Sequence, residues 1–586
     1  MAWLTYVFPI AILLLISLFF LDCRDTDSID LIQKKSRGIG RGEAALLMIL
    51  CVVYTLTAFY KLGDREAPQS FITLNAGDEL TVDLGESIPV SGIMYYIGAK
   101  NGDWELSFSD DGDIRTEAQK FDEGVSAVFK WQKPEVSVQA RYLHIRASER
   151  VVFGEFAVFS GGEPVYPDAA SCSAPELFDE QGVVPLRPTY LSGTYFDEVY
   201  HARTAYEHYS GIYPYEVSHP PLGKLLISLG ISLFGMTPFG WRFTGTLFGA
   251  LMLLPLYYLL KRMFGGRVVP LCGTAIFAFD FMHYTQTRIA TIDTYAVFFI
   301  ILMYLFMYLW VSGGRLRHLA LCGLFFGLGA ASKWTCLYAG AGLAVIWFLD
   351  WLHRLKKGGT AKKFILNCLF CVLAFVIVPA AIYYLSYIPY GRASGLGEGM
   401  IFTKDYADIV LKNQKFMLSY HQGVHSEHPY SSRWYQWIFD IRPILYYLDR
   451  RDNNMLSTFG AFSNPVLCWG GLGAMGVTAY RAVKKRDRLA GFIVLGYLAQ
   501  LLPWVFISRT TFAYHYFPSE VFLLLALCYV FALYEEKNEK GWKIGVYGIT
   551  GLSVALFAVF YPVLSGMALD RSLADALYKW LPSWPF

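Results

Sequence analysis

Long apolar runs recur along most of the chain and are separated by short polar segments. A helix needs about 20 mainly apolar residues to cross the hydrocarbon layer of a bilayer. We expect a membrane-spanning helix in each of twelve runs, although Ser332 and Lys333 interrupt one neighbouring pair. The twelve runs cover residues 3–21, 44–60, 239–261, 268–284, 292–312, 318–332, 334–351, 364–387, 463–480, 489–507, 519–535 and 544–563.

Residues 66–165 follow a different pattern, in which apolar and polar positions alternate between clusters of Gly, Asp and Asn. Alternation with a period of two predicts short strands, and the turn residues predict a β-sandwich. The stretch ARYLHIRAS…FGEFAVF at its end resembles the last strands of galactose-binding-like jelly rolls. Such a domain can bind a sugar or act as a spacer, and the sequence slightly favours a spacer.

The chain therefore divides into a series of segments. We expect two spanning helices in 1–62, the sandwich in 63–168, a polar loop with amphipathic helices in 169–238, a helical core in 239–387, a second polar loop in 388–462 and further spanning helices in 463–586.

Basic residues predict the orientation. Because Lys and Arg accumulate in cytoplasmic loops, and because six short basic connections all fall on one side of a twelve-span chain, that side is expected to be cytoplasmic. The sandwich, both long polar loops and residues 508–518 are then extracytoplasmic. The six basic connections are 22–43, 261–267, 313–318, 352–363, 481–488 and 536–543.

The composition agrees with a polytopic membrane protein. Apolar residues make up 55% of the chain and charged residues 17%, against about 45–50% and about 25% in soluble domains. The net charge of +2 gives no indication of a nucleic-acid partner.

The first outer loop carries the polar residues that are most suggestive of chemistry. It reads YFDEVYHARTAYE over residues 195–207 and HPPLGK over residues 219–224. If 197–208 is helical, Asp197 and His201 share one face, and the stretch after HPPLGK forms an interfacial amphipathic helix. An alternative is that Tyr and His anchor this loop at the interface and that the acids Asp197 and Glu198 are incidental.

Further charged residues lie at the predicted outer ends of other helices. Arg288 and Asp293 could form a structural ion pair or contribute to a site, since charges near a bilayer are usually paired or functional. Lys333 could extend to the membrane surface or face a cavity. The later outer loops add His428, Arg509 and His515.

Three histidines, His421, His425 and His428, have a spacing that would suit a metal site on a helix. Gly423 and Pro429 make a helix there doubtful, so we predict no metal site and no required cofactor, with a role for a divalent metal left open.

Acids on one outer loop and cations on others suit a particular reaction. A carboxylate can remove a proton from a hydroxyl, and cations can stabilise a departing phosphate. This combination favours group transfer from a lipid phosphate to a hydroxyl. The chain has no phosphate-binding P-loop, which argues against a nucleotide-sugar donor.

Five motifs, in order along residues 190–535, resemble those of the protein O-mannosyltransferases: FDEVYHARTAYE with HPPLGK, QTRIATIDTYAVFF, ASKWTCLYAGAGL, HPYSSRWYQWIFDIRPILYY and SRTTFAYHYFPSE. The resemblance implies the GT-C fold and inverting transfer of mannose from a polyprenyl phosphate to Ser or Thr hydroxyls. It implies Asp197 as the base, assisted by Glu198. Candidate residues for binding the donor phosphate or substrate are His219, Lys224, Arg242, Arg288, Asp293, Lys333, His428, Arg509 and His515.

The chain departs from the eukaryotic members of this family. Residues 388–462 are too few to hold their β-trefoil repeats, and the sandwich and the 3–21 helix are additional. The resemblance is therefore to a bacterial, plasma-membrane member with a polyprenyl carrier. A lipid or cell-wall glycan remains open as the acceptor, the oligomeric state is open, and a transporter or a glycan-binding sensor are the alternatives of another class.

Overall fold

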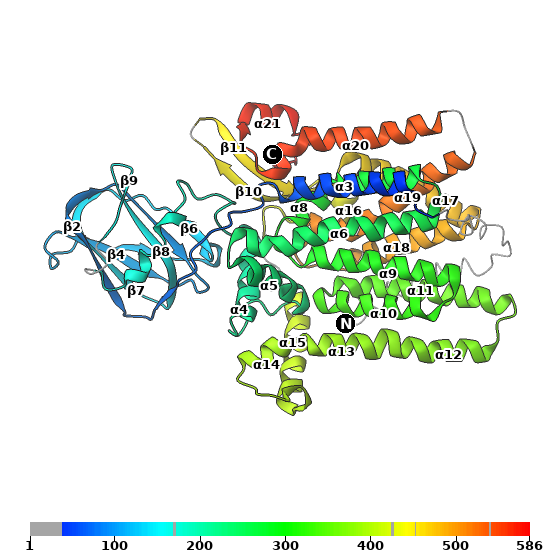
Figure 1. Cartoon of the computed structure of the whole chain (residues 1–586), viewed down its shortest axis with the longest axis horizontal. Coiled ribbons are helices and arrows are strands. Elements are labelled where there is room, and N and C mark those ends of the chain that lie inside the picture. Colours follow the sequence, from blue (N-terminus) through cyan, green and yellow to red (C-terminus); the bar gives the residue numbers. More distant parts are fainter. Residues whose placement is uncertain (1–37, 168–171, 424–426, 452, 538–540) are drawn as a thin grey trace. The chain divides into compact units, whose positions relative to one another are not determined.

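The computed structural model describes residues 38–167, 172–423, 427–451, 453–537 and 541–586 (Figure 1). The predicted span 3–21 lies outside these residues. The chain divides into two compact units. The sandwich unit comprises Lys61–Glu216 and Lys224–Thr244, and the helical unit comprises the described residues up to Tyr60, Val217–Gly223 and Gly245–Phe586.

The predicted β-sandwich is confirmed. Two antiparallel sheets, with strand orders β1-β8-β3-β6 and β2-β7-β4-β5, enclose one apolar core, and β9 pairs with β8. Trp104 is fully buried in this core and stacks on Phe121. The strands are β1 (Ile72–Leu74), β2 (Glu79–Val90), β3 (Gly92–Ile97), β4 (Trp104–Ser109), β5 (Gln119–Phe121), β6 (Lys130–Gln132), β7 (Val138–Ala147), β8 (Val151–Ser160) and β9 (Glu163–Val165).

Both helices predicted in the first polar loop are present: α4 (Glu198–Tyr209) and α5 (Leu222–Phe234). In α5, Ile227 and Ile231 are buried, whereas Leu229 and Leu233 are exposed. This helix therefore has apolar residues on its buried side and on its exposed side, as an interfacial helix requires.

Long helices, most of which lie side by side in Figure 1, and several short helices make up the helical unit. They are α3 (Arg41–Phe59), α6 (Pro238–Phe264), α7 (Val268–Ala278), α8 (Phe281–Thr287), α9 (Asp293–Gly313), α10 (Leu316–Ser332), α11 (Thr335–Lys356), α12 (Ala361–Val372), α13 (Val378–Leu385), α14 (Ile388–Ala393), α15 (Lys404–Gly423), α16 (Trp434–Ile438), α17 (Gly471–Lys484), α18 (Arg488–Val505), α19 (Phe517–Glu536), α20 (Trp542–Ser565) and α21 (Arg571–Leu577).

Eight of the described helices are long and apolar enough to span a membrane, and α7 with α8 would make a ninth. These two are bent by 54°, because Asp280 begins a new helix by accepting a hydrogen bond from the His283 N–H at 2.9 Å. The predicted spans 318–332 and 463–480 are helical, but α10 and α17 are only 17 and 14 residues long.

Burial distinguishes central from peripheral helices. In the spanning part of α19, 83% of residues are buried, against 22% in α3, 22% in α20 and 17% in the helix over Ala361–Ala393. The exposed apolar side chains of these three helices are those expected to face lipid.

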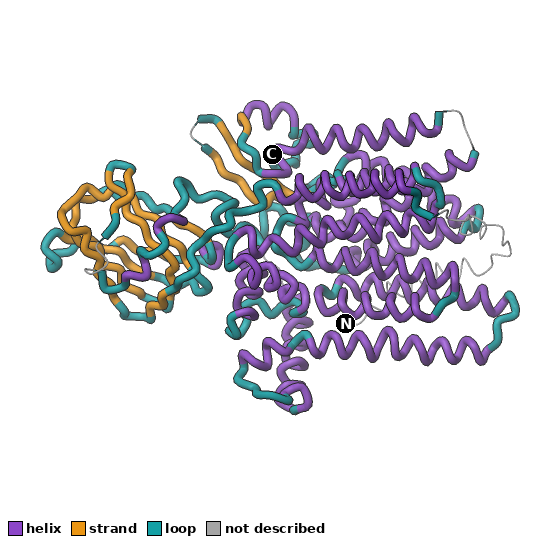
Figure 2. Tube along the Cα trace, viewed as in Figure 1, coloured by secondary structure: helices purple, strands orange, loops and turns teal. Residues whose placement is uncertain are grey.

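The loop predicted over 388–462 is more ordered than expected. It contains α14, α15 and α16 and a hairpin of β10 (Ile444–Arg450) and β11 (Met455–Ala461), which β12 (Leu569–Asp570) extends (Figure 2). Helix α15 includes Gly423, so this glycine does not prevent a helix there.

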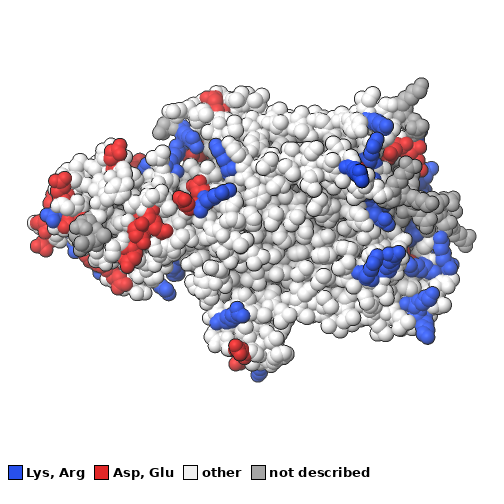
Figure 3. Space-filling model, in the orientation of Figure 1, with Lys and Arg blue, Asp and Glu red and all other residues white. Residues whose placement is uncertain are grey.

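Basic residues gather at one end of the helix bundle, where α11 ends and α12 begins (Figure 3). The surface between the two ends of the bundle is almost free of charged groups in this view. This distribution agrees with a bundle that crosses a membrane and has a basic surface on one side.

Candidate active site

Asp197 lies at the N-terminus of α4 and is half-buried. Its carbonyl oxygen accepts the first hydrogen bonds of the helix, from the N–H groups of Tyr200 and His201, each at 3.1 Å. Phe196, directly before it, has a φ of 47°, which is rare for a bulky residue and costs free energy. The surrounding structure must therefore hold this turn in place.

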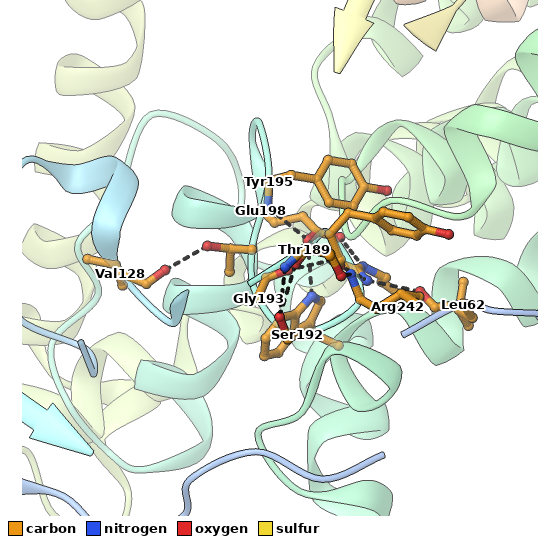
Figure 4. A network of polar contacts seen from close by, with 12 residues as sticks. Leu62, Val128, Thr189, Ser192, Gly193, Tyr195, Glu198 and Arg242 are labelled. Carbon is orange, nitrogen blue, oxygen red and sulfur yellow. Dashed lines mark hydrogen bonds and ion pairs between the residues drawn. The ribbon is translucent and has the colours of Figure 1, made fainter. Parts of the chain in front are cut away.

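Glu198 lies in a different environment, because it is fully buried and bound to Arg242 of α6 (Figure 4). The Arg242 Nε and Nη2 donate to the two carboxylate oxygens at 2.8 and 2.7 Å. The Trp241 indole N–H and the Tyr195 backbone N–H also donate to the Glu198 carboxylate, at 3.2 and 3.3 Å.

Arg242 uses its remaining donors on backbone carbonyls of the same unit. Its Nη1 donates to Leu62 at 2.9 Å and to Tyr190 at 2.8 Å, and its Nη2 donates to Gly193 at 2.8 Å. A guanidinium has five N–H donors, so these three bonds and the two to Glu198 engage all of them. The pair fixes the chain on either side of Asp197.

The sandwich supports the same turn. The Thr194 N–H and hydroxyl donate to the carbonyls of Phe129 and Val128 at 3.0 and 2.6 Å, and Tyr206 of α4 packs edge-on against Phe129, with 5.2 Å between ring centroids. The loop that carries Asp197 is therefore built on the sandwich.

Lys224 of HPPLGK is fully buried and donates to the Glu216 carbonyl at 2.7 Å, while it forms an ion pair with the Glu216 carboxylate. Burial lowers the pKa of the nearby His208 to about 3, and the charge of Lys224 adds to this effect. His208 is therefore neutral near pH 7.

Glu207 of α4 binds the segment between α4 and α5. It pairs with Arg203 at 2.9 Å and accepts a hydrogen bond from the Tyr215 N–H at 2.6 Å. Burial raises the pKa of Glu207, although the Arg203 pair and the hydrogen bonds oppose the increase.

The helical unit contains a pocket of about 440 Å³ at the junction of α10 and α11. Its wall combines cations, histidines and aromatic rings. The lining residues are His219, Lys333, Trp334, Thr335, Tyr338, Leu418, His421, Gln422, Trp504, Phe506, Ile507, Ser508 and Arg509.

Two cations line this pocket. Lys333 forms a 2.6 Å ion pair with Asp293, and both are largely buried. Arg509 is half-buried, donates to the Thr510 carbonyl at 3.3 Å and lies over Trp504. Among the described residues Arg509 has no acidic partner in an ion pair. The pocket therefore suits an anion.

The two histidines of the pocket are in contact, with 5.2 Å between their ring centroids. Burial, together with the nearby His219 and Arg509, lowers the pKa of His421 to about 3. His421 is therefore neutral near pH 7.

The other predicted binding residues lie outside the pocket wall. Arg288 donates to the carbonyls of Ala58 and Tyr60, each at 2.9 Å, and so caps α3. His428 accepts from the Tyr430 N–H at 3.2 Å, and His515 is buried and stacked on Tyr514.

The sequence interpretation did not identify four aromatic residues of the pocket wall: Trp334, Tyr338, Trp504 and Phe506. Trp334 and Tyr338 belong to the same motif as Lys333, and Trp504 lies five residues before Arg509. Their position close to Lys333 or Arg509 in the sequence is the signal from which they could have been predicted.

Within the described ranges, one group of three carboxylates has the spacing of a metal site: Glu155, Asp179 and Glu180 in the sandwich unit. Glu180 accepts from the N–H groups of Gln69 and Ser70 at 2.8 and 3.0 Å, and Glu155 accepts from that of Glu180 at 3.0 Å. These bonds give the two glutamates a structural role. His425 lies outside the described residues.

Comparison with known proteins gives two family matches. Residues 218–384 match the family model for dolichyl-phosphate-mannose-protein mannosyltransferase. Residues 407–584 match that for the C-terminal four-transmembrane-helix region of protein O-mannosyltransferase. Both matches begin after residue 217, so neither contains Asp197 or Glu198.

Relatives agree with these matches. The polyprenol-phosphate-mannose–protein mannosyltransferase of Mycobacterium tuberculosis is 25% identical over 429 residues, which are 63% of this chain and 81% of the relative. The enzyme of the same name from Mycolicibacterium smegmatis is 23% identical over 468 residues, 68% of this chain and 89% of the relative.

The fold also matches a solved structure, the Saccharomyces cerevisiae protein O-mannosyltransferase Pmt1-Pmt2 complex bound to the sugar donor. The TM-score is 0.59 at 14% identity, over 67% of this chain and 89% of that chain. This likeness confirms the expected GT-C fold. With two family models covering more than half of its length, the chain belongs to the protein O-mannosyltransferase family.

Proposed function

We propose that this membrane glycosyltransferase moves mannose from a polyprenyl phosphate carrier to Ser or Thr hydroxyls of proteins. The relatives named above are polyprenol-phosphate-mannose–protein mannosyltransferases. The observation that carries the proposal is the pocket lined by Lys333 and Arg509 in a unit of membrane-spanning helices. Such a pocket can bind the phosphate of a donor whose lipid tail remains in the bilayer.

The donor phosphate is bound by Arg509 and Lys333. Arg509 is suited to this role because a guanidinium offers planar, paired N–H donors to phosphate oxygens. Lys333 adds a second positive charge, and Asp293 fixes its position. His421, which is neutral near pH 7, can donate a further hydrogen bond.

Asp197 is the general base. Its carboxylate takes the proton of the acceptor hydroxyl, and the hydroxyl oxygen forms a bond to C1 of the mannose. The bond from C1 to the phosphate oxygen breaks, and polyprenyl phosphate leaves with the bonding electrons. The cations of the pocket stabilise its added charge. Attack opposite the leaving group inverts C1.

Glu198 and Arg242 position this base. The resemblance implied that Glu198 assists in binding or in positioning and that Arg242 binds the donor phosphate or substrate. Their mutual hydrogen bonds and complete burial favour a positioning role for both. Arg288 and Lys224, which bind backbone carbonyls, have similar positioning roles.

We also place Asp197 and the sandwich on the extracytoplasmic side of the plasma membrane. The support for this orientation is the accumulation of Lys and Arg at the opposite, short connections of the helix bundle, such as 352–363. An extracytoplasmic acceptor would then be a protein that has already been exported.

The test is transfer of radiolabelled mannose from polyprenyl phosphate to a Ser/Thr-containing acceptor peptide by the purified protein. Asp197→Asn should lower the turnover number by at least a thousandfold, while binding of the donor is retained. Glu176→Gln removes an exposed acid of the same unit and should leave turnover within twofold.

Arg509→Gln should instead raise the KM for the donor at least tenfold, because it removes a phosphate contact. Near-normal turnover in Asp197→Asn would refute the base. Label that enters lipid or glycan but never peptide would refute the protein acceptor.

A further inference from the structure

A second pocket, of about 340 Å³, lies in the helical unit where α6 and α9 end and α10 begins. Its size is at the lower end of the range for small-molecule sites, about 300–1,000 Å³. Three arginines and a histidine dominate its wall. The lining residues are Tyr258, Arg262, Leu309, Ser312, Gly313, Arg315, Arg317 and His318.

The positive charge of this pocket is uncompensated in the described part of the chain. Arg262, Arg315 and Arg317 form no ion pair there with an acidic residue. The buried Arg262 Nε also has no hydrogen-bond partner among the described residues. A buried guanidinium N–H without an acceptor is costly, so the pocket is built to receive one.

An anion is the acceptor that suits this pocket best. Ser312 uses its hydroxyl hydrogen on the Tyr308 carbonyl at 2.8 Å, and the adjacent Arg354 donates to the last carbonyls of α9 at 3.3 and 3.4 Å. These bonds occupy nearby neutral acceptors. The N-terminus of α10, at Arg315–Arg317, adds the favourable end of a helix dipole.

Helix α10 fixes the depth of this pocket in the membrane. Its 17 residues span about 25 Å at 1.5 Å per residue. Arg315 precedes the helix and Lys333 follows it, so the two pockets lie near opposite surfaces of a hydrocarbon layer about 30 Å thick. Because α10 and α11 are consecutive spans, the start of α10 lies at the same end of the bundle as the end of α11, where basic residues gather.

We propose that this pocket binds the phosphate of an anionic phospholipid headgroup in the leaflet opposite the donor pocket. Basic pockets between helices on the cytoplasmic side are suited to such headgroups. The bound phosphate accepts hydrogen bonds from Arg262, Arg315 and Arg317, and the acyl chains remain in the bilayer against α6 and α9. Inorganic phosphate carries the same kind of negative charge but has no acyl chains to hold it in the bilayer. The experiment below distinguishes these two ligands.

The experiment uses the full chain in detergent, with dioleoyl phosphatidylglycerol or dioleoyl phosphatidylcholine added, and native mass spectrometry to count the bound lipids. The wild type should retain one phosphatidylglycerol in preference to phosphatidylcholine. Each basic residue near a membrane surface contributes about a fivefold effect. Arg315→Gln/Arg317→Gln should therefore weaken this binding at least tenfold.

Lys362→Gln/Lys363→Gln is the matched control, because it removes two exposed charges at the start of α12. It should change the binding less than twofold. An equal loss in the control, equal binding of the two lipids, or displacement by millimolar inorganic phosphate would each overturn the proposal.

A second measurement does not depend on the folding of a variant. A photoactivatable phosphatidylglycerol should crosslink the wild type within residues 309–318 or 258–262, and crosslinks elsewhere only would also overturn the proposal. Neither measurement uses mannosyl transfer, so the outcome is independent of the proposed function.

Discussion

At the scale of single residues, two adjacent acids have opposite environments. Asp197 is half-buried at a helix start, whereas Glu198 is fully enclosed and bound by Arg242. Neighbouring helical residues point about 100° apart, so one can face an open site while the other faces the protein. This difference gives the two acids separate, measurable roles.

The Glu198–Arg242 pair should be essential for stability. Removing one partner of a buried ion pair leaves an uncompensated charge and costs about 3–5 kcal/mol. Arg242→Met should lower the free energy of unfolding by about this amount, measured by thermal unfolding in detergent. Arg146→Met, an exposed site of the same unit, should change it by less than about 0.5 kcal/mol.

If Arg242→Met instead unfolds like the wild type but has lost donor binding, Arg242 contacts the substrate and the positioning role is wrong. Asp197→Asn should show the reverse behaviour of a positioning variant, with an unchanged unfolding temperature and lost turnover.

His421 should make the protein sensitive to acid. Its pKa is about 3 in the folded chain, because of burial and the nearby His219, Arg509 and Lys333, and about 6.5 in the unfolded chain. Between these values the unfolded state binds more protons, so stability falls as the pH drops below about 6.5.

His421→Gln removes this contribution. Since the ring is partly exposed, we expect the wild type to lose about 1 kcal/mol more than the variant between pH 7.5 and pH 5. Thermal unfolding at both pH values measures the difference, and equal acid sensitivity would contradict the assigned pKa.

At the scale of elements, ion pairs connect the breaks between helices. Asp293 begins α9, and Lys333 separates α10 from α11. Their 2.6 Å contact fixes one wall of the pocket. The pair therefore has a structural contribution and, through Lys333, a contribution to the charge of the pocket.

A double-mutant cycle separates these contributions. Asp293→Asn and Lys333→Met should each lower the free energy of unfolding by about 3 kcal/mol. The combined variant should recover at least half of the summed loss, because neither charge is then left unpaired. It should nevertheless keep a raised KM for the donor. Recovery of normal KM in the double variant would exclude Lys333 from phosphate binding.

Elements were more predictable from the sequence than the contacts between them. A local apolar run is sufficient to indicate a helix such as α9 or α19, and alternation is sufficient to indicate the sandwich. The partner of Glu198 lies 44 residues away, and the carbonyls bound by Arg288 lie 228 and 230 residues away. No local sequence pattern specifies contacts between residues so far apart. The motifs therefore predicted binding roles for Arg242 and Arg288 and did not predict that both side chains are buried.

The sandwich was interpreted as a spacer, but its contacts give it a supporting role for the Asp197 loop. Thr194→Val removes the hydrogen bond that the buried hydroxyl donates to the Val128 carbonyl, while it retains the size of the side chain. We expect a loss of about 1–2 kcal/mol in stability and a lower turnover number. Thr81→Val, which alters a half-buried hydroxyl of β2, should leave turnover unchanged.

Normal turnover in Thr194→Val would restore the interpretation of the sandwich as a spacer. Deletion of 66–165 is a less specific test, because it removes the carbonyls of Val128 and Phe129 together with the whole domain.

At the scale of the whole molecule, the two ends of α10 carry cationic pockets of different character. The pocket at Lys333 combines its cations with aromatic rings and histidines, whereas the pocket at Arg315 is dominated by arginines. A donor with a neutral sugar attached to its phosphate suits the first, because aromatic faces and hydrogen-bond donors can bind the sugar. A simple phosphate headgroup suits the second.

The proposed orientation of the molecule rests on the same distribution of charge and can be tested with two single cysteines. Leu186 is 99% exposed in the sandwich unit, and Lys363 is exposed at the start of α12, at the basic end of the bundle. The described native cysteines are buried or half-buried, so the wild type provides a low background.

In intact cells, a membrane-impermeant maleimide should label Leu186→Cys and should label Lys363→Cys only after the membrane is opened. The reverse pattern would place Asp197, which shares the sandwich unit with Leu186, on the cytoplasmic side, where no exported acceptor could reach it.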